Sequence, residues 1–357
     1  MTDLCKRFHI SRRIGYKWLD RYREEGVAGL EDRSRAPHAC PHKTSVDVEA
    51  ALVREREKHP HWGAKKLVPY LQQRQPELLL PAKSTAGAIL KRNGLIDSRR
   101  RRRKPVHPGG GALVTTAPHQ VWTADFKGEF RLGNGELCYP LTISDAHTRY
   151  LMACHALPST TQVGAAPIFA QLFAEHGLPV AIRTDNGSPF ASTALCGLSR
   201  LSVAWIKLGI QHQRITPGQP QQNGRHERMH RTLKAETARP PERDLVRQQE
   251  RFDAFCAEFN QERPHEALAY ATPASGFAPS PRALPATLPE PGYPGHFELR
   301  QVKSGGAIRF RQRRLLFLSD VLRGEQVGLE EVEDGIWSVY FYHLLIGRFD
   351  ERELRIH

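Results

Sequence analysis

The sequence is poor in cysteine, and no two of its six cysteines have Cys-x-x-Cys spacing. In a chain of 357 residues this scatter argues against a disulfide framework and is typical of reduced thiols in a cytosolic protein. The segment His38-Ala39-Cys40-Pro41-His42 has ligand-type residues, but tetrahedral zinc needs four ligands and no matching second half lies nearby. We therefore expect neither disulfides nor a structural zinc.

Long hydrophobic runs are also absent. No apolar stretch approaches the roughly 18–20 residues needed to span a bilayer. The longest candidate, residues 339–346, is short and contains His343. Met1 is followed by charged residues and not by the apolar segment of a signal peptide. We expect a soluble, intracellular protein with no membrane partner.

Positive charge is concentrated in the first third of the chain. Residues 1–104 contain 25 of the 52 Lys and Arg but 12 of the 38 Asp and Glu, a net charge of +13. The remaining 253 residues have a net charge of +1. This division is typical of a nucleic-acid-binding region attached to a nearly neutral body.

Residues 1–35 have the pattern of a helix-turn-helix. Residues 2–10 predict a short helix, and Ser11 is a suitable N-cap for a second helix that ends at Gly26. Its apolar stripe and its basic start favour insertion into a DNA major groove over an ordinary helical hairpin with solvated charges. Such a pair usually follows another helix, which we expect to be missing here. The stripe consists of Ile14, Trp18 and Tyr22, and the candidate DNA contacts are Arg12, Arg13 and Lys17.

Residues 45–97 predict a second helical DNA-binding unit, with helices over 47–58, 64–73 and 84–92. Ser84 is the expected N-cap of the third helix, and Gly94 its expected end.

A basic, Gly-rich linker over residues 98–117 follows. Its six consecutive cations repel one another and cannot pack, so we expect them to order only on phosphates, by releasing counterions. A merely solubilising tail is a weaker interpretation, because the run joins two folded units. The cations are Arg99, Arg100, Arg101, Arg102, Arg103 and Lys104.

Residues 118–270 predict an α/β domain with a mixed sheet, because three consecutive strands precede alternating helices and strands. A Pro-rich linker over 271–295 and a small β domain over 296–357 complete the chain, with hairpin turns at 305–306 and 334–335. The expected strands of the α/β domain cover 121–126, 136–143, 150–156 and 180–184, and the expected helices cover 162–176, 194–208, 221–238 and 244–260.

Three carboxylates in the α/β domain have settings that suggest chemistry. Asp125 lies in the middle of the first strand among aromatic residues, where an unpaired charge is costly. Asp185 ends a strand in RTDNG, and ligands of open α/β sheets bind at the carboxyl ends of strands. Glu227 lies in the helix QQNGRHERMHRTLK. Because 60 and 42 residues separate the three, only tertiary folding can bring them together.

Each of these residues also has a structural explanation when it is taken alone. Asp-Asn-Gly is a common turn, and Glu227 could form a salt bridge with Arg231 one helical turn later. Asp145 in TISDAHTRY resembles a turn residue and is interpreted as structural. Together, however, three carboxylates can hold two Mg²⁺ (or Mn²⁺) ions about 3.5–4 Å apart, one activating an attacking oxygen and one stabilising the leaving oxygen.

The stretch from about residue 118 to 238 resembles the catalytic core of retroviral integrases and of bacterial insertion-sequence transposases, which have a ribonuclease-H-like fold. The resemblance rests on WTADF, RTDNGSPF and QPQQNGRHERMHRTLK, and more weakly on the N-terminal helix-turn-helix and on HEAL at 265–268. It implies that Asp125, Asp185 and Glu227 are the catalytic, metal-binding triad of those families. The 42-residue gap is longer than in retroviral integrases, so we expect an extra loop or helix near 193–208.

The helix with Glu227 has a basic face. Residues 227, 231 and 234 follow one another at helical spacing, so Arg231 and Lys234 would project beside the metal site and hold a DNA end by its phosphates. A solvated basic stripe is the alternative interpretation.

The resemblance implies a transposase that binds the ends of an insertion sequence, hydrolyses a phosphodiester with metal ions and transfers the freed strand to target DNA. The expected partners are double-stranded DNA and further copies of the chain as a homo-oligomer, with no small-molecule cofactor. The expected location is the bacterial cytoplasm, nucleoid-associated on DNA. Two alternatives stay open: a catalytically inactive DNA-binding protein or regulator derived from such an element, and a nuclease of the same fold that cuts without joining.

Replacing the run Arg99–Lys104 by glutamine is expected to weaken DNA binding mainly at low salt. Every cation removed from a phosphate lowers the slope of log affinity against log salt by about 0.9, so the slope should fall by roughly 3–5. Fluorescence anisotropy of a labelled duplex over a salt series measures it. An unchanged slope would show that the run does not bind phosphates.

Overall fold

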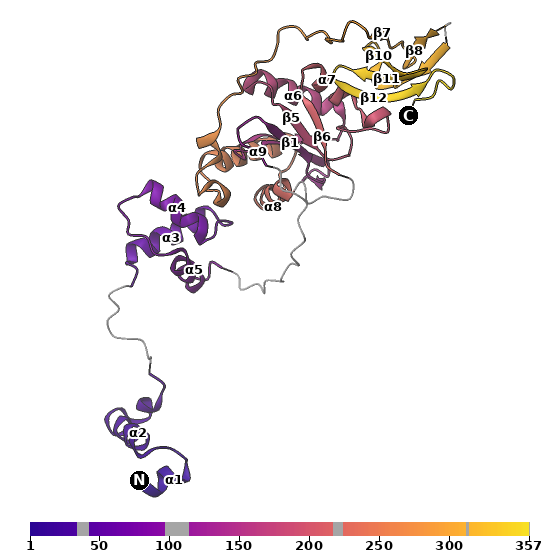
Figure 1. Ribbon diagram of the computed structural model, residues 1–357. Helices are drawn as coiled ribbons and strands as arrows, with labels where there is room; N and C mark the ends of the chain where they lie inside the picture. The colour runs from indigo at the N-terminus through magenta and orange to yellow at the C-terminus, as the bar shows by residue number, and fades with distance from the viewer. Residues whose placement is uncertain (34–42, 97–113, 217–223, 312–313, 357) are drawn as a thin grey trace. The chain divides into compact units, whose positions relative to one another are not determined.

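The computed structural model describes residues 1–33, 43–96, 114–216, 224–311 and 314–356 (Figure 1). The chain divides into two compact units, residues 1–45 and residues 46–357. The run Arg99–Lys104 and the segment His38–His42 lie outside the described residues. Within those residues, none of the helices combines the length and the apolar character that a membrane crossing requires.

The first unit is a small helical assembly. As predicted, Ser11 caps its second helix, because its hydroxyl accepts from the backbone N–H of Ile14 at 3.3 Å. The predicted apolar stripe lies largely at the surface, since Ile14 and Tyr22 are 45% and 50% exposed. The short first helix packs closely on the second at Gly15, whose added Cβ would lie 2.5 Å from the Cys5 Sγ. The elements are α1 (Thr2–Arg7), α2 (Arg12–Glu25) and η1 (Gly26–Leu30).

The second unit begins with three helices around their own apolar core, which includes Leu52, Leu67 and Leu90. The predicted cap at Ser84 is wrong: the third helix begins one residue earlier, and its N-cap Ala82 has no side chain that can accept a hydrogen bond. Gly94 ends that helix at φ +73°, as predicted. The helices are α3 (Val46–Lys58), α4 (Ala64–Arg74) and α5 (Lys83–Arg92).

A mixed sheet forms the centre of the second unit, in the strand order β2-β3-β1-β5-β6, with β4 paired to β3. The β1–β3 and β3–β4 pairs are antiparallel, whereas β1–β5 and β5–β6 are parallel. The strands are β1 (Val121–Phe126), β2 (Phe130–Arg131), β3 (Leu137–Asp145), β4 (Leu151–Leu157), β5 (Ala181–Thr184) and β6 (Gln211–Arg214).

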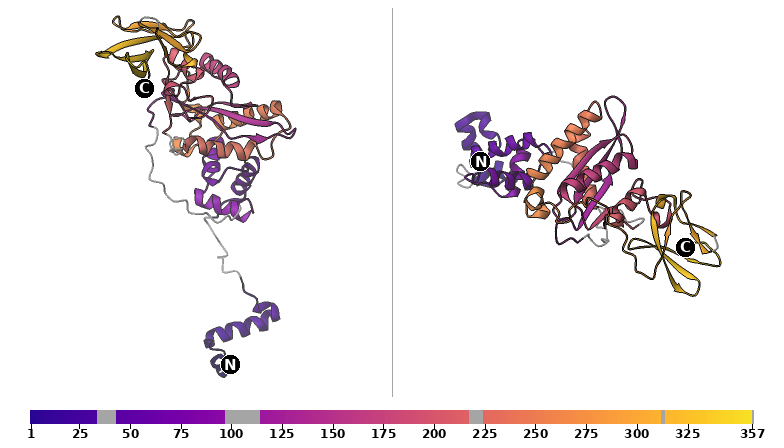
Figure 2. Two further views of the ribbon diagram at one scale, coloured as in Figure 1. Left: turned by 90° about the vertical axis from the view of Figure 1, so that its right-hand side faces the viewer. Right: turned by 90° about the horizontal axis from the view of Figure 1, so that it is seen from above.

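Helices cover both faces of this sheet. On β1, Trp122 and Ala124 belong to the same apolar core as Phe169 of α6 and Trp205 of α7, while a second core gathers β4, α8 and α9 around Phe252. In both views of Figure 2 the orange α9 lies between the sheet and the helices α3–α5, and an ion pair between His59 and Glu258 at 3.3 Å joins the two parts. The helices are α6 (Gln162–His176), α7 (Arg200–Lys207), α8 (Gly224–Thr237) and α9 (Leu245–Gln261).

Two strands and one helix differ from the sequence-based expectation. The sequence did not predict β2 or β6. The edge strand β6, QHQR, has no apolar residue and therefore no alternating pattern. The helix expected over 194–208 is a short 3-10 turn at Leu195–Gly197 followed by α7, and Ser199 caps α7 with a side-chain bond to the N–H of Ser202.

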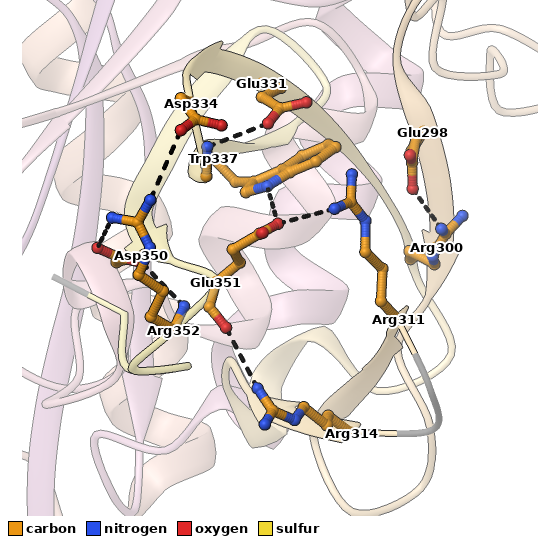
Figure 3. Close-up of polar contacts among 11 residues, drawn as sticks. Glu298, Arg300, Arg311, Arg314, Glu331, Asp334, Trp337, Asp350, Glu351 and Arg352 are labelled. Atoms are coloured by element: carbon orange, nitrogen blue, oxygen red, sulfur yellow. Dashed lines mark hydrogen bonds and ion pairs between the residues drawn. The ribbon is translucent and has the colours of Figure 1, made fainter.

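The C-terminal strands form a four-stranded antiparallel sheet, β12-β11-β10-β7, and a separate hairpin, β8-β9. Their core includes Val203 and Ile206 of α7. Gly335 has positive φ between the paired strands β10 and β11, which confirms the hairpin turn predicted at 334–335. Gly306 also has positive φ in a turn, but the strands on its two sides, β7 and β8, belong to different sheets, so the hairpin predicted at 305–306 is wrong. At one edge Glu351 accepts from Arg311 at 3.0 Å and from the Trp337 indole at 3.3 Å (Figure 3). The strands are β7 (Glu298–Gln301), β8 (Ala307–Phe310), β9 (Arg314–Phe317), β10 (Gln326–Glu333), β11 (Ile336–Phe341) and β12 (Leu344–Asp350).

Asp145 organises the turn between β3 and β4. Its buried carboxylate accepts from the backbone N–H groups of His119, His147 and Thr148 at 2.7–3.1 Å, and from the Thr148 hydroxyl at 2.7 Å. A carboxylate with four donors needs no other partner, which agrees with the structural interpretation of this residue.

Asp145→Ala is expected to lower the free energy of unfolding by about 2–4 kcal/mol, because buried N–H groups lose their acceptor. Urea unfolding followed by tryptophan fluorescence measures the change. The matched control is Asp334→Ala, which removes a fully exposed carboxylate 3.6 Å from Arg352 and should change the stability far less. Equal effects of the two substitutions would contradict a structural role for Asp145.

Candidate active site

Asp125 and Asp185 lie beside each other at the ends of neighbouring parallel strands. Trp122 pairs with Ile182 and Thr123 with Arg183, so the same register continued by two residues brings Asp125 level with Asp185. Parallel neighbours are about 4.8 Å apart. The two carboxylates that are 60 residues apart in sequence therefore meet at one edge of the sheet.

The local chain around Asp185 supports its carboxylate. Oδ1 accepts from the backbone N–H of Gly187 at 3.1 Å. A Cβ at position 187 would lie 3.0 Å from Oδ2, so glycine leaves room for the carboxylate. The predicted Asp-Asn-Gly turn is thus also the support of an acidic side chain.

The charge of Glu227 acts on Asp125 together with the charge of Asp185. Burial raises the pKa of the Asp125 carboxyl to about 7, and the charges of Asp185 and Glu227 add to the rise. Only 17% of the Asp125 side-chain surface is exposed, so water screens this repulsion poorly. Glu227 itself is exposed in the first turn of α8. The structure thus brings Asp125 and Asp185 together, with Glu227 near enough for its charge to act on Asp125.

Lysines partly balance this negative charge. Lys127, two residues after Asp125, opposes the rise in the Asp125 pKa. Burial and the nearby Lys234 lower the pKa of Lys127, whereas Asp125 raises it. Lys234 therefore lies near Lys127, and Arg231 is exposed on the same helix, while their predicted place beside a metal site stays a prediction. Lys127 was not predicted, although it follows Asp125 by two residues, the spacing that puts side chains on one face of an extended chain.

The buried face of α8 holds a second group that sequence reasoning missed. His226 and His230 both contact the Thr142 hydroxyl, and the His230 Nδ1 lies 3.8 Å from the Asp125 Oδ2. Burial lowers the pKa of His226 to about 4 and that of His230 to about 2, so both rings are neutral. The sequence could have indicated this group, because two histidines four residues apart lie on one face of the predicted helix.

The donor chemistry of the carboxylates fits a hard divalent cation, because Mg²⁺ and Mn²⁺ prefer oxygen ligands and offset the repulsion among acidic groups. Across the described ranges, no set of three or more His, Cys, Asp or Glu side chains is drawn close enough together to hold a metal ion. Glu227 adds least to the Asp125 pKa and is exposed, so it is the carboxylate with the most freedom to approach a cation.

The remaining predicted DNA contacts lie elsewhere. Arg12, Arg13 and Lys17 are exposed on α2, in the first compact unit. Lys17 is also placed over the Trp18 ring, 5.8 Å from its centroid.

Comparisons with known proteins agree with the sequence motifs. Residues 115–220 and residues 208–273 match two family models, each described as an integrase core domain, and residues 14–90 match a homeodomain-like domain. The first two matches together include Asp125, Asp185 and Glu227.

Several curated proteins are similar to the chain. An uncharacterized protein of insertion element IS476 from Xanthomonas euvesicatoria is 27% identical over 302 residues, 82% of this chain and 82% of that protein. An insertion element IS407 protein from Burkholderia multivorans is 32% identical over 195 residues, 53% of this chain and 66% of that protein. The Gag-Pol polyprotein of avian reticuloendotheliosis virus is 32% identical over 38% of this chain, which spans 11% of the polyprotein.

The solved structures that match the chain include a simian T-cell lymphotropic virus intasome in complex with the PP2A regulatory subunit B56 gamma. Its matched chain is 18% identical with a TM-score of 0.41, over 82% of this chain and 97% of that chain. The HTLV-2 integrase catalytic core domain in complex with magnesium is 16% identical with a TM-score of 0.36, over 45% of this chain and 97% of that chain.

Asp125→Asn is expected to stabilise the metal-free protein at high pH. The folded-state pKa of Asp125 lies above its unfolded value, so the carboxyl favours folding when protonated and disfavours it as pH rises from about 4 through 7. The neutral amide removes this penalty, and at pH 8 with EDTA the gain should be on the order of 2–4 kcal/mol.

Thermal unfolding from pH 5 to pH 8 measures this effect, and the advantage of the variant should shrink toward pH 5. Added Mg²⁺ should raise the melting temperature of the parent more than that of Asp125→Asn. A variant that is no more stable than the parent at pH 8 would contradict the assigned repulsion.

Proposed function

The chain carries integrase core domains and a homeodomain-like domain and is homologous to insertion-element proteins, and we propose that it is the transposase of such an element. It binds the ends of the element in double-stranded DNA and hydrolyses a phosphodiester there, which frees a 3′-hydroxyl. The 3′-oxygen then attacks a phosphodiester of target DNA, forms a new bond to that phosphorus and displaces the 3′-hydroxyl of the cut target strand. This reaction takes place in the bacterial cytoplasm.

The convergence of three carboxylates supports this proposal most directly. Asp125 and Asp185 are level on neighbouring parallel strands, and Glu227 acts on Asp125 from α8. Carboxylates that repel one another destabilise a fold. Carboxylates with strongly raised pKa values are therefore typical of catalytic sites, where the chemistry requires them.

In the proposed site Asp125, Asp185 and Glu227 hold two Mg²⁺ or Mn²⁺ ions. Bound there, the ions supply activation of the attacking oxygen and charge stabilisation of the leaving oxygen. The carboxylates repel a bare phosphate, so they would place the scissile phosphate between β1 and β5 only when they hold the cations. Lys127 and Lys234, which flank the same edge, attract the flanking phosphates and hold the DNA end in place.

The other basic parts of the chain bind DNA away from the reacting bond. Arg12, Arg13 and Lys17 on α2 contact the terminal repeats, Arg231 adds a phosphate contact beside the site, and Arg99–Lys104 supply salt-dependent affinity. Two DNA ends have to meet for strand transfer, so the active form is a homo-oligomer.

Asp185→Asn is expected to reduce both cleavage and strand transfer by about three orders of magnitude or more, because the amide is a poor ligand for a hard cation. The assay uses Mg²⁺, a labelled oligonucleotide with an element end, and supercoiled target. Asp253→Asn is the matched control, since Asp253 is exposed on α9 and bonds Gln249.

The three candidate functions give different results in this assay. A transposase cuts and joins, a nuclease cuts without joining, and a non-catalytic regulator does neither while binding the same DNA. Unchanged activity of Asp185→Asn would refute the assigned triad.

A further inference from the structure

A basic pocket of about 190 Å³ lies beside α8. Its walls come from four parts of the chain: α4, the turn between β3 and β4, α8, and the end of α9 with the residues that follow it. Small-molecule sites usually measure about 300–1,000 Å³, so the pocket fits a compact group better than a whole cofactor. The cations in its lining are Lys66, Arg149, Arg228 and Arg263.

The pocket and the candidate metal site use different faces of α8. Arg228 and Thr232 line the pocket, whereas Glu227 does not. Residues of an α-helix follow one another at about 100°, so Glu227 and Lys234 share one face while Arg228 and Thr232 share another. A ligand of the pocket would therefore lie beside the candidate site and not in it.

Two of the four cations have no carboxylate partner. In the part of the chain that the structure describes, neither Lys66 nor Arg228 forms an ion pair with an Asp or Glu side chain. Arg263, in contrast, is 5% exposed and donates to both carboxylate oxygens of Glu236, at 2.9 and 3.2 Å. The charges of Lys66 and Arg228 are thus left to a partner from outside the chain.

The two carboxylates in the pocket lining are already engaged. Asp145 accepts from four donors in the turn between β3 and β4. Glu266 is exposed and pairs with Lys65 at 2.9 Å. The lining therefore has more positive than negative charge.

Neighbouring groups respond to this excess of positive charge. Burial, and after it the charge of Arg263, lowers the pKa of Lys66 to about 8. Burial also lowers the pKa of His265, in the pocket wall, to about 4. The charges of Arg263, Lys66 and Arg149 all add to that second shift. Three cations acting on one ring produce a local field that attracts an anion.

Arg149 has an uncommon backbone conformation. Its φ is +63°, in the left-handed region that favours glycine. Its N–H donates to the Asp145 carbonyl at 3.0 Å, so the turn that Asp145 organises also presents Arg149 to the pocket. Residues held in this region are found preferentially at binding and catalytic sites.

We propose that this pocket holds a backbone phosphate of bound DNA, through Lys66, Arg149 and Arg228. The oxygens of a phosphodiester only accept hydrogen bonds, so one phosphate can receive bonds from all three cations. It also supplies the negative charge that Lys66 and Arg228 lack. The inference rests on the proposed function for the identity of the anion, but the pocket can be tested without any reaction.

The position of the pocket favours DNA over a free anion. Lys66 belongs to α4, in the three-helix region that the sequence predicts to bind DNA, and Arg228 belongs to the helix with Glu227. A strand that runs from α3–α5 to the candidate active site would pass this pocket. A phosphate held there would fix the strand on both sides of α8, because Lys234 lies on the face with Glu227.

Salt-dependent DNA binding by the full chain, without divalent cations, tests the pocket. Lys66→Gln and Arg228→Gln should each weaken binding of a labelled duplex by about threefold to tenfold at low salt. Each should also lower the slope of log affinity against log salt by about 1. Arg247→Gln is the matched control, because it removes an exposed arginine of α9 that pairs with Glu250 at 2.8 Å. Affinities and slopes equal to those of the control would overturn the proposal.

The double variant distinguishes one shared phosphate from two separate contacts. If Lys66 and Arg228 bind the same phosphate, the loss of affinity in the double variant should be clearly smaller than the product of the two single losses. Losses that multiply would show that the two cations act apart, and the shared site would be refuted.

Thermal unfolding separates DNA binding from a structural role. Lys66→Gln removes the repulsion by Arg263, so this variant should melt no lower than the parent. Arg228 is exposed, so its replacement should leave the melting temperature unchanged. If both variants melted well below the parent, the two cations would be structural and the proposal would fail.

Inorganic phosphate is the second probe, in isothermal titration calorimetry. Because a DNA strand brings its phosphate to the pocket already linked to other contacts, we expect the free ion to bind far more weakly than the duplex. The pocket would instead serve a free anion if the variants lost phosphate binding and kept the DNA affinity of the parent. That result would overturn the proposal.

The outcomes separate this inference from the proposed function. If the variants follow the prediction but the parent neither cuts nor joins DNA, the phosphate pocket stands and the transposase function fails. If the parent transfers strands and the pocket variants bind DNA like the control, the function stands and the inference fails.

Discussion

The parallel pairing of β1 with β5 is the constraint on which the site depends. It places Asp125 and Asp185 side by side, and the burial that makes the sheet stable also strengthens their repulsion. The apolar face of the same strand offsets this cost: Trp122 and Ala124 are packed against α6 and α7 and hold β1 in place. Alternate side chains of β1 therefore lie on opposite faces of the sheet: those on one face pack in the apolar core, and Asp125 on the other face is repelled by neighbouring carboxylates.

The helices and strands that have a clear apolar pattern could be predicted from the sequence. β1 and α6 were predicted with their observed bounds, because alternation and helical spacing were clear over their whole length. β6 and the two-residue β2 could not be found, since pairing with a neighbour, and not their own composition, makes them strands. The start of α5 was misplaced because Ser84 satisfies the capping rule, whereas the chain begins the helix at Lys83 without a side-chain cap.

Some residues of the candidate site could be predicted from the sequence, and others could not. Asp125, Asp185 and Glu227 stood in recognisable motifs. The structure places the two aspartates on neighbouring strands, with Glu227 near enough to act on the pKa of Asp125, and their catalytic role stays a prediction. The contacts of Thr142 could not be predicted from the sequence, because they arise from cross-strand pairing with Asp125 and from histidines 84 and 88 residues away. Buried polar networks of this kind depend on tertiary geometry, for which one sequence carries no local pattern.

The helix α7 belongs to two hydrophobic cores at once. Trp205 and Leu201 face the central sheet, while Val203 and Ile206 complete the core of the C-terminal strands. The length of the chain between Asp185 and Glu227 is therefore constrained by packing in both cores. A deletion that shortened this segment would remove none of the three carboxylates and yet open the core of the C-terminal strands. The length of the chain between Asp185 and Glu227 therefore matters to the packing of the C-terminal strands as well as to the candidate site.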